Sequence, residues 1–517
     1  MSFVRLLDVA ALLSGLAVLS SLAYWWWRPE EIFLVLLGIV ALRLLVAPVP
    51  VPRLRPRRVV VVGVAVYAVY FSFVTLTRHW TFKTHALDLA YYVQLTWNLA
   101  RGAGPRVSLP EMHAWGDHFS PIMYLFVPVF WVAPGPSVLL IAQSIALGLG
   151  ALAVFGIAAR RLGDERPAAV FAVLYLIHPS LHGINVRDFH SAALAIPLLL
   201  AAIYFVEAGR PWLYGAAVLL ILATREDAAI AVVGLGLWLA VTKRRWLWGA
   251  ATVLGAFAVL MVDTRWLIPH FRREPYPHLG RYAHLGRSVP EIIGTLVLHP
   301  WRVLSGLVTE KRLVYLGALL APLAFLPLLA PEALVGLAPP LLENLLGQDP
   351  ILFDHRTQYQ SFILPFLFAA AIAGYDRLAL RRPGPWPRTV LVVAIMASLV
   401  LSARTVNNLS YERAVPKLEH RQAFEVMAQV PAGAAVSAQD PYVPHLALRP
   451  LVFVFPVGIE KADYLLLNTS SYPWRKDPDV TMKREGDTVT ITKGKGGPTY
   501  RYVVAAERGP NLLLRRR

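Results

Sequence analysis

The chain has 517 residues, of which 56% are hydrophobic, and a formal net charge of +18. This apolar fraction is above that of ordinary soluble domains and indicates a polytopic membrane protein. The absence of cysteine excludes disulfides and thiolate metal sites. No nucleic-acid-binding motif accompanies the positive charge, so we assign the arginines to loops that face the cytoplasm and anionic lipid.

Apolar runs long enough to cross a bilayer begin close to the N-terminus. The first two, at about 9–27 and 32–49, are followed by a loop with four arginines at Arg53–Arg58. The positive-inside rule places this loop, and therefore the N-terminus, in the cytoplasm. A third span at about 59–77 then leads outside, so that the polar stretch 78–121 becomes a large outer loop.

Ten more spans are expected after this loop, which gives about thirteen crossings and an outer C-terminus. The apolar run 122–132 is too short to cross and is expected to be interfacial or re-entrant. Short basic turns at Arg160–Arg166 and Lys243–Arg245 are expected in the cytoplasm. The ten expected spans lie at about 137–159, 168–182, 192–206, 212–224, 228–241, 247–266, 313–330, 331–346, 360–375 and 389–401.

The composition changes after residue 403, where long apolar runs give way to short ones. Residues 417–430 have the pattern of an amphipathic helix, and AAVSA, LVFVF and ADYLLLN are typical of short buried strands. DTVTITKGKGGPTYRYVVAA predicts a β-hairpin around glycine-rich turn residues. We therefore expect a mainly α polytopic domain over 1–403 and a small extracytoplasmic α/β domain over 404–517.

Acidic residues and histidines gather on the expected outer side, at or near the ends of spans. Ionisable residues at membrane depth are costly, so they mark a function or a buried partner. Carboxylates that converge with a histidine could bind a hard divalent cation, and a carboxylate could equally act as a general base. These candidates are Asp88, Asp117, His118, Asp188, His190, Glu226 and Asp227.

Helix capping is the main structural alternative for the first candidates. Asp88 opens the helical stretch 87–102, where an N-cap carboxylate is common. Asp188 and His190 stand just before a new span, so a capping role is equally open for them. His118 lies two residues before Ser120 and could belong to a capping network there.

Two other polar groups have structural alternatives of a different kind. In Arg225-Glu226-Asp227 the neighbours could simply pair with one another. Gln94, Asn98 and Arg101 form one stripe of the outer helix, which we expect to face water or lipid headgroups.

The basic loop 268–312 is the second candidate region for binding. Arginine suits bidentate phosphate contacts, so Arg272 and Arg273 are candidate substrate ligands. The alternative is a solvated face over anionic headgroups. No Walker loop, Gly-x-Ser-x-Gly or His-Glu-x-x-His supports a nucleotide or hydrolase site.

Several ordered blocks resemble a known membrane protein family. LDLAYYVQLTWNLARG, DHFSPIMYLFVPVFW, HPSLHGINVRDFHSAALAIPLLL and TREDAAIAVVGLGLWL resemble the prokaryotic family named domain of unknown function 2079. PPLLENLLG, QYQSFILPFLFAAAIAG and VPAGAAVSAQDPYVPHLALRPLVFVFP are similar to its later blocks, so the match covers about 71–468. The family is similar in layout to GT-C glycosyltransferases, which are multi-span enzymes with an acidic residue in the first large outer loop.

This resemblance implies roles for particular residues. Asp88 would match the loop carboxylate that serves as base or metal ligand, and Asp188 a second acidic position after a later span. The implied donor is a sugar on a polyprenyl phosphate, reached from the membrane. Val93 stands where the family often has a second acidic residue, so a role that needs that carboxylate is not expected here.

We therefore expect a GT-C-like glycosyltransferase of the cell membrane, which moves a sugar from a polyprenyl-phosphate donor to an extracytoplasmic acceptor. Asp88 and Asp188 are the expected catalytic residues, and with His190 they would hold a divalent cation such as Mg²⁺ or Mn²⁺. The expected substrate-binding residues are His118, Glu226, Arg272 and Arg273. The alternatives are a non-enzymatic transporter or lipid-handling protein, and a membrane anchor for the C-terminal domain.

The expected orientation can be tested by single cysteines, because the native chain has none. An impermeant thiol reagent added to intact cells is expected to label Thr488→Cys in the C-terminal domain. It should leave Arg57→Cys unlabelled until the cells are opened, because that residue lies in the arginine-rich inner loop. Labelling of Arg57→Cys but not Thr488→Cys would overturn the orientation.

Overall fold

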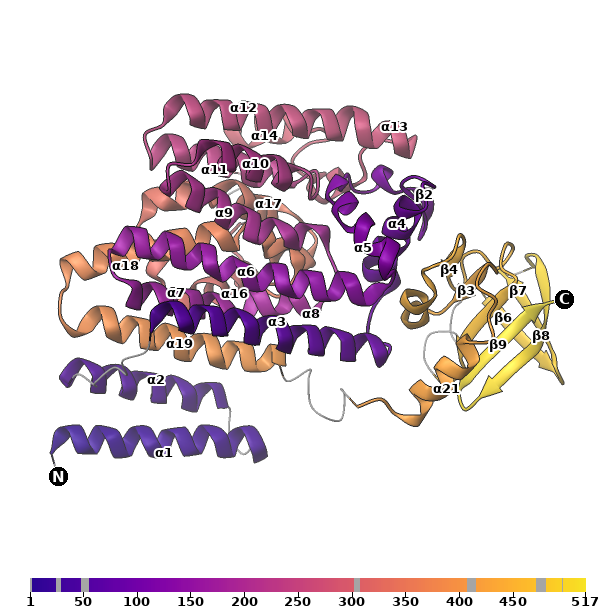
Figure 1. Ribbon diagram of the computed structural model, residues 1–517, viewed down its shortest axis with the longest axis horizontal. Coiled ribbons are helices and arrows are strands. Elements are labelled where there is room, and N and C mark those ends of the chain that lie inside the picture. The colour runs from indigo at the N-terminus through magenta and orange to yellow at the C-terminus, as the bar shows by residue number, and fades with distance from the viewer. Residues whose placement is uncertain are drawn as a thin grey trace.

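Apolar helices lie side by side with their long axes roughly aligned, and the C-terminal strands lie beyond one end of them (Figure 1). We describe a computed structural model over residues 2–24, 29–47, 55–301, 307–406, 415–470, 480–494 and 496–517. Within these ranges, six helices are long and apolar enough to cross a membrane. They cover Phe3–Ser21, Pro56–Trp80, Pro136–Leu162, Glu165–Val186, Trp246–Arg272 and Pro385–Ser402.

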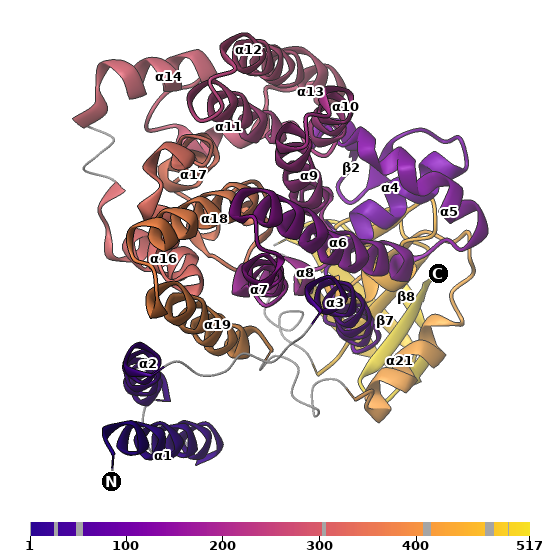
Figure 2. The same ribbon diagram turned by 60° about the vertical axis from the view of Figure 1, so that its left-hand side comes forward.

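Shorter apolar helices pack among the long ones, so the predicted mainly α fold is confirmed, while the total of thirteen crossings stays a prediction. Figure 2 shows α1 and α2 as a pair beside α19. The helices of the bundle are α1 (Phe3–Tyr24), α2 (Pro29–Val46), α3 (Pro56–Trp80), α6 (Pro136–Leu162), α7 (Glu165–Leu176), α8 (Pro179–Val186), α9 (Ala195–Glu207), α10 (Pro211–Leu222), α11 (Ala228–Val241), α12 (Trp246–Val262), α13 (Ile268–Arg272), α14 (Val289–Leu298), α18 (Leu364–Arg381) and α19 (Pro385–Val406).

Proline and glycine set the ends of several of these helices. α3, α6 and α10 begin at Pro56, Pro136 and Pro211, where the missing N–H costs no intrahelical hydrogen bond. α6 ends before Gly163, whose φ of 66° lies in the left-handed region that glycine adopts without strain. These breaks fix where the polar turns between helices lie.

The region predicted as two spans at 313–330 and 331–346 is broken into short pieces. Proline recurs through it, and each proline removes a backbone donor and disfavours a continuous helix. Ala324 and Phe325 also take positive φ values, 47° and 58°, which end the helical path. The pieces are α16 (Glu310–Leu320), the 3₁₀ turns Ala321–Leu323, Leu326–Leu329 and Pro331–Val335, and α17 (Ala338–Leu346).

The segment after α3 that is predicted to be an outer loop, which we name the outer segment, folds into short elements that cover one another. A π-helical turn η1 (Ala86–Ala90) leads into α4 (Tyr91–Ala100), and a small antiparallel hairpin follows. Its strands are β1 (Arg106–Ser108) and β2 (Glu111–His113). The apolar run predicted to be interfacial forms a 3₁₀ turn, Pro121–Phe126, and α5 (Val127–Val132).

The stripe of α4 predicted to face water or headgroups is instead mostly buried. Gln94 has no exposed surface, and its side chain bonds Ser108 and the carbonyl of Arg449. Asn98 is also buried and donates to the carbonyl of Arg106. The prediction was wrong because the β1–β2 hairpin and the C-terminal region cover this face of the helix, which helical periodicity alone does not reveal.

The C-terminal strands of the described residues form one mixed seven-stranded sheet in the order β4-β3-β5-β9-β8-β7-β6. β3 runs parallel to both β4 and β5, and the remaining pairs are antiparallel. The predicted buried strands and hairpin are therefore confirmed, while the boundary at 403 stays a prediction. The elements are α21 (Leu418–Met427), β3 (Val436–Ala438), β4 (Val452–Val454), β5 (Tyr464–Asn468), β6 (Val480–Glu485), β7 (Thr488–Lys493), β8 (Thr499–Arg508) and β9 (Asn511–Arg516).

The sheet and the outer segment share one hydrophobic core. Leu95 of α4 belongs to the same buried cluster as Val426 of α21 and Val436 of β3. The C-terminal elements are thus packed against the outer loop, not tethered beside it. This contact places them next to the candidate residues of that loop.

Removing the Gln94 side chain is expected to weaken this contact. Gln94→Ala leaves the backbone donor of Ser108 and nearby carbonyls buried without their partner, which costs roughly 1–3 kcal/mol. The melting temperature of the purified protein in detergent should fall. Arg101→Ala, at the exposed end of the same helix, is the control and should cost about 1 kcal/mol or less through its contact with Trp97. An equal fall in both variants would contradict the packing role of Gln94.

Candidate functional site

The acidic candidates lie in turns at the end of the helix bundle that faces the C-terminal sheet. They come from the outer segment after α3, the turn after α8 and the turn between α10 and α11. The loop that follows α13 adds further histidines and tyrosines. Two polar clusters result, which we name the Asp88 cluster and the Glu226 cluster.

The Asp88 cluster is built on a contact between two predicted residues. Asp88 lies in the middle of η1, and His190 Nε2 is 3.1 Å from its Oδ1. Its side chain therefore contacts a distant turn and does not cap its own helix. Burial would raise the pKa of Asp88, but the charge and hydrogen bond of His190, with His85 and Arg187, lower it below its ordinary value. Asp88 is thus half-exposed and ionised beside a buried imidazole.

Gln143 of α6 fixes the turn that carries Asp188 and His190. Its amide donates to the Asp188 carbonyl at 2.7 Å and accepts from the His190 backbone N–H at 2.9 Å. Asp188 has a φ of 67°, a conformation that short polar residues tolerate. A single buried amide in the helix bundle therefore holds both residues in place.

Asp188 itself is almost fully buried and points toward the outer segment. Its Oδ2 accepts from the backbone N–H of His85 at 2.8 Å, while Oδ1 has no hydrogen-bond partner among the described residues. Burial raises the pKa of Asp188 to about 6, and the charge of Asp88 adds to the rise while His85 lowers it. Asp188 bonds the backbone of His85 and Asp88 contacts His190, so the two predicted catalytic carboxylates share one region.

A residue of the C-terminal region completes the Asp88 cluster. Asp440 Oδ2 is 2.6 Å from His85 Nδ1, and Asp440 Oδ1 accepts from the Ala86 backbone N–H at 2.9 Å. The bond to Asp440 raises the pKa of His85. Asp440 and Asp188 therefore hold the start of η1 from two sides and set the direction of Asp88.

The Glu226 cluster is organised by a carboxylate whose side chain is fully buried. Glu226 Oε1 lies 2.8 Å from His118 Nδ1 and accepts from the Tyr276 hydroxyl at 2.9 Å. Its Oε2 accepts from the backbone N–H of Phe119 at 3.1 Å. Burial opposes the charge of both partners, yet their mutual attraction lowers the pKa of Glu226 and raises that of His118. His118 and Glu226 thus form a buried ion pair.

Beside this pair lies the Asp/His group with the spacing of a metal site. One ligand atom from each of Asp117, His118 and His278 lies within 4.8 Å of the other two. The His118 and His278 rings stack at 4.4 Å, and His278 Nε2 is 3.6 Å from Asp117 Oδ1. Burial would raise the pKa of Asp117, but His278, His118 and Arg272 lower it to about 2. A carboxylate and two imidazoles form a donor set that divalent transition metals accept.

The two clusters are joined through hydroxyl groups. Ser191, next to His190, lies 3.0 Å from the Tyr92 hydroxyl and 3.2 Å from Ser120 Oγ. Ser120 in turn follows His118 by two residues. The segments that carry His190 and His118 are therefore in direct contact, and the clusters form two sides of one polar region.

A large apolar cavity opens from the Glu226 cluster into the helix bundle. Its volume is about 530 Å³, and its walls come from α11, α12, α14 and α17. His118, His278 and Arg281 line its polar end together with the carboxyl groups of Asp227 and Glu343. Residues such as Leu237, Phe257 and Ile292 line the rest. The cavity thus combines a hydrocarbon-like interior with charged and imidazole groups at one end.

Of the two arginines predicted to bind substrate, one lies beside the Glu226 cluster and the other lines a different cavity. Arg272 ends α13 next to the Glu226 cluster, with one guanidinium nitrogen 3.5 Å from the Gly116 carbonyl. Arg273 instead lines a separate polar cavity of about 520 Å³ beside Arg106 and His270. In the Arg225-Glu226-Asp227 triplet, Arg225 pairs with Asp227 as expected. Glu226 does not join that pair, so the self-pairing alternative fails for this residue.

The predicted metal ligands Asp88, Asp188 and His190 are brought together only in part. Asp88 and His190 are in contact, whereas Asp188 bonds the backbone of His85. Among the described residues, the three-ligand group is the one formed by Asp117, His118 and His278.

Sequence reasoning missed three residues of this region: His278, Tyr276 and Asp440. His278 and Tyr276 lie in EPYPHLGRYAHLGR, where histidine and tyrosine recur. This stretch belongs to the basic loop 268–312, whose arginines alone were predicted to bind substrate. Asp440 lies in SAQDPYVPH, a block recognised without any role for its carboxylate. The recurrence of ring residues was a usable signal for the first two, but nothing local pointed to Asp440.

Residues 78–492 match the model of the family described as predicted membrane protein (DUF2079). The chain belongs to this family. That match confirms the predicted resemblance and covers both clusters and the C-terminal sheet as far as β7. A comparison of this DUF2079 protein with curated protein sequences gave no match.

Solved structures similar to this DUF2079 protein include ArnT and an archaeal oligosaccharyltransferase. ArnT from Cupriavidus metallidurans bound to undecaprenyl phosphate has 14% identity, 88% coverage of this chain, 97% coverage of its own and a TM-score of 0.50. Apo ArnT gives 15% identity, the same two coverages and a TM-score of 0.48. The Archaeoglobus fulgidus oligosaccharyltransferase with zinc and sulfate has 14% identity, coverages of 79% and 68%, and a TM-score of 0.45. The first comparison shows that the fold is that of ArnT, in agreement with the predicted GT-C layout.

The raised pKa of Asp188 predicts a pH effect on stability. An unfolded aspartate has a pKa near 3.8, so between about pH 4 and pH 6 the folded protein binds more protons. Stability is therefore lost as pH rises through this window. Asp188→Asn keeps an acceptor for the His85 N–H and removes the loss, which is on the order of 2 kcal/mol. Its melting temperature in detergent with EDTA should change less between pH 4.5 and pH 7 than that of wild type.

Asp487→Asn is the control for this experiment, because Asp487 is exposed in the β6–β7 turn. It should keep the pH dependence of wild type. An Asp188→Asn variant with the same dependence as wild type would show that Asp188 is ionised in the fold throughout this range.

Proposed function

We propose that this protein is a GT-C-like glycosyltransferase that moves a sugar from a polyprenyl-phosphate donor to an extracytoplasmic acceptor. The observation that carries the proposal is the apolar cavity whose polar end is lined by His118 and His278, which form a three-ligand group with Asp117. A polyprenyl phosphate has the matching chemistry: a long hydrocarbon chain that ends in an anion. The shared fold with ArnT, which was solved bound to undecaprenyl phosphate, supports the same donor class.

The lipid chain of the donor would occupy the apolar part of the cavity, with its phosphate at the polar end. There Arg281 supplies a positive charge, and Arg272 supplies another beside Asp117. The buried pairing of His118 with Glu226 fixes the imidazole orientation, so that Nδ1 is held by the carboxylate and Nε2, once it has released its proton, can take a ligand. These residues bind and orient the phosphate so that the sugar carbon faces the Asp88 cluster.

Asp117, His118 and His278 would hold a divalent cation. The donor set fits, because His278 Nε2 is buried, has no hydrogen-bond partner among the described residues and lies 3.6 Å from Asp117. When bound, the cation would neutralise charge on the leaving phosphate. We place it here and not on the sequence-predicted set of Asp88, Asp188 and His190, because the Asp117 group already has close ligand spacing.

Asp88 would act as the general base on the other side of the polar region. Its carboxylate is ionised, half-exposed and oriented by His190. It takes the proton of the acceptor hydroxyl as that oxygen bonds to the anomeric carbon, and the bond from that carbon to the phosphate oxygen breaks. The phosphate leaves with the bonding electrons. Asp188 and Asp440 act through the start of η1, which they hold in place.

Two substitutions are expected to separate base from metal binding. Asp88→Asn should lower transfer from radiolabelled polyprenyl-phosphate sugars by about 10²-fold or more, because the base is lost. It should leave Mn²⁺ binding, measured by electron paramagnetic resonance, unchanged. His278→Gln should abolish Mn²⁺ binding and the response of transfer to added Mn²⁺.

Asp487→Asn is the matched control for charge removal and should transfer at the wild-type rate. Loss of Mn²⁺ binding in Asp88→Asn, with retention in His278→Gln, would return the metal to the sequence-predicted set. Wild-type protein that binds these donors yet never turns them over, across a broad acceptor panel, would reject the transferase and favour the lipid-handling alternative.

A further inference from the structure

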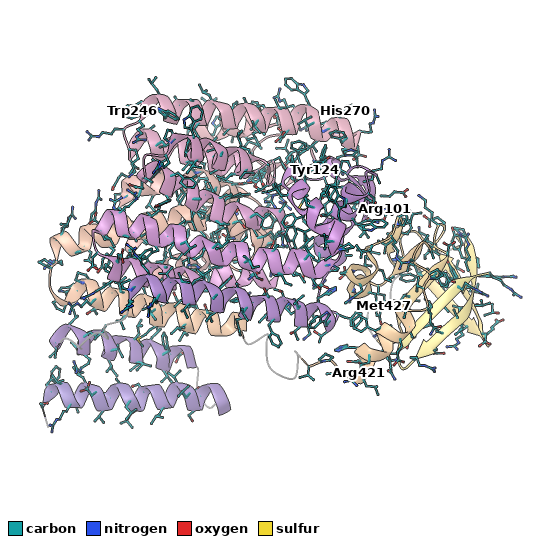
Figure 3. All side chains as sticks on the ribbon, viewed as in Figure 1. Arg101, Tyr124, Trp246, His270, Arg421 and Met427 are labelled. Atoms are coloured by element: carbon teal, nitrogen blue, oxygen red, sulfur yellow. The ribbon has the colours of Figure 1, made fainter. Side chains whose placement is uncertain are left out.

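A second large cavity lies at the end of the bundle opposite the candidate site. It measures about 570 Å³ and sits between the α9–α10 turn and the α11–α12 turn. Figure 3 shows its lining residue Trp246 at one end of the α12–α13 rod and His270 at the other. None of the residues given a role in the proposed glycosyltransferase lines this cavity.

The rim of this cavity carries three arginines from the two turns. Arg210 comes from the first turn, and Arg244 and Arg245 come from the second. All three are exposed, and none of their side chains has a hydrogen-bond or ion-pair partner within the described part of the chain. The nearby carboxylate of Glu207 is already paired with Lys243. The rim therefore has an uncompensated positive charge.

The wall of the cavity has the opposite character. Phe205, Leu239 and Trp248 supply an apolar and aromatic surface below the arginines. Trp246 and Leu247, also in the lining, are 63% and 85% exposed, as expected for side chains at the boundary between headgroups and hydrocarbon. A cationic rim above an apolar wall matches an amphiphile with an anionic head.

We infer that this cavity binds an anionic phospholipid, with its phosphate held by Arg210, Arg244 and Arg245 and its upper acyl chain against the wall. Arginine binds phosphate oxygens bidentately, and basic pockets between helices are typical sites for anionic headgroups. A free phosphate ion would use the rim alone and leave the apolar wall in water. The bound phospholipid then lies in the leaflet away from the candidate site.

Native mass spectrometry of the full-length protein in detergent can test this site. Wild type should retain phosphatidylglycerol in preference to phosphatidylcholine, with acyl chains matched. The triple variant Arg210→Gln, Arg244→Gln, Arg245→Gln should lose that preference, with affinity for phosphatidylglycerol reduced by ~10-fold or more. Inorganic phosphate at millimolar concentration should not displace the lipid from wild type.

A triple variant at the α18–α19 turn is the matched control. Arg381→Gln, Arg382→Gln and Arg388→Gln remove the same charge from exposed arginines outside the cavity. The control should retain the lipid preference, and both variants should melt within a few degrees of wild type. If the rim variant is unstable, Arg245→Gln alone should still weaken retention. Equal loss in rim and control variants, unchanged retention in the rim variants, or displacement by free phosphate would each overturn the inference.

Discussion

The buried carboxylate of Glu226 makes the interactions on which the end of the bundle that carries the candidate site depends. Its two oxygens accept from His118 and the backbone of Phe119 in the outer segment, and from Tyr276 in the loop after α13. A carboxylate without these partners would be an uncompensated buried charge, one of the most costly defects in a protein. Glu226 therefore draws the outer segment and the loop after α13 toward the α10–α11 turn, and the metal-type group forms beside it.

In the Asp88 cluster, too, carboxylates bond groups from distant segments, and one of these carboxylates comes from the C-terminal region. Asp188 bonds the backbone of His85 just before η1 and Asp440 bonds that of Ala86 at its start, so the turn that carries Asp88 has little freedom. The shared core of α4 and the sheet then fixes that arrangement. The C-terminal region is in this way part of the site and not an appended module.

The sequence predicted features that depend on neighbouring residues and missed those that depend on contacts between distant segments. Apolar runs, proline breaks and strand patterns are local, so the helical bundle and the C-terminal strands could be predicted. The contact of Asp88 with His190 was suggested only by the predicted membrane topology, which puts both residues on the same side of the bilayer. The burial of Gln94, the role of Asp440 and the partnership of His278 with Asp117 depend on packing between distant segments. No spacing along the chain encodes those contacts, and they could not be predicted.

The apolar walls of the cavity beside His118 have a consequence for how its occupant is supplied. A molecule with a long hydrocarbon chain is almost absent from water, so it reaches such a cavity by lateral diffusion within the bilayer. Occupancy then follows the mole fraction of that molecule among the membrane lipids and not its amount per volume of buffer. Dilution of the aqueous phase therefore leaves the occupancy of the cavity unchanged, whereas addition of inert lipid lowers it.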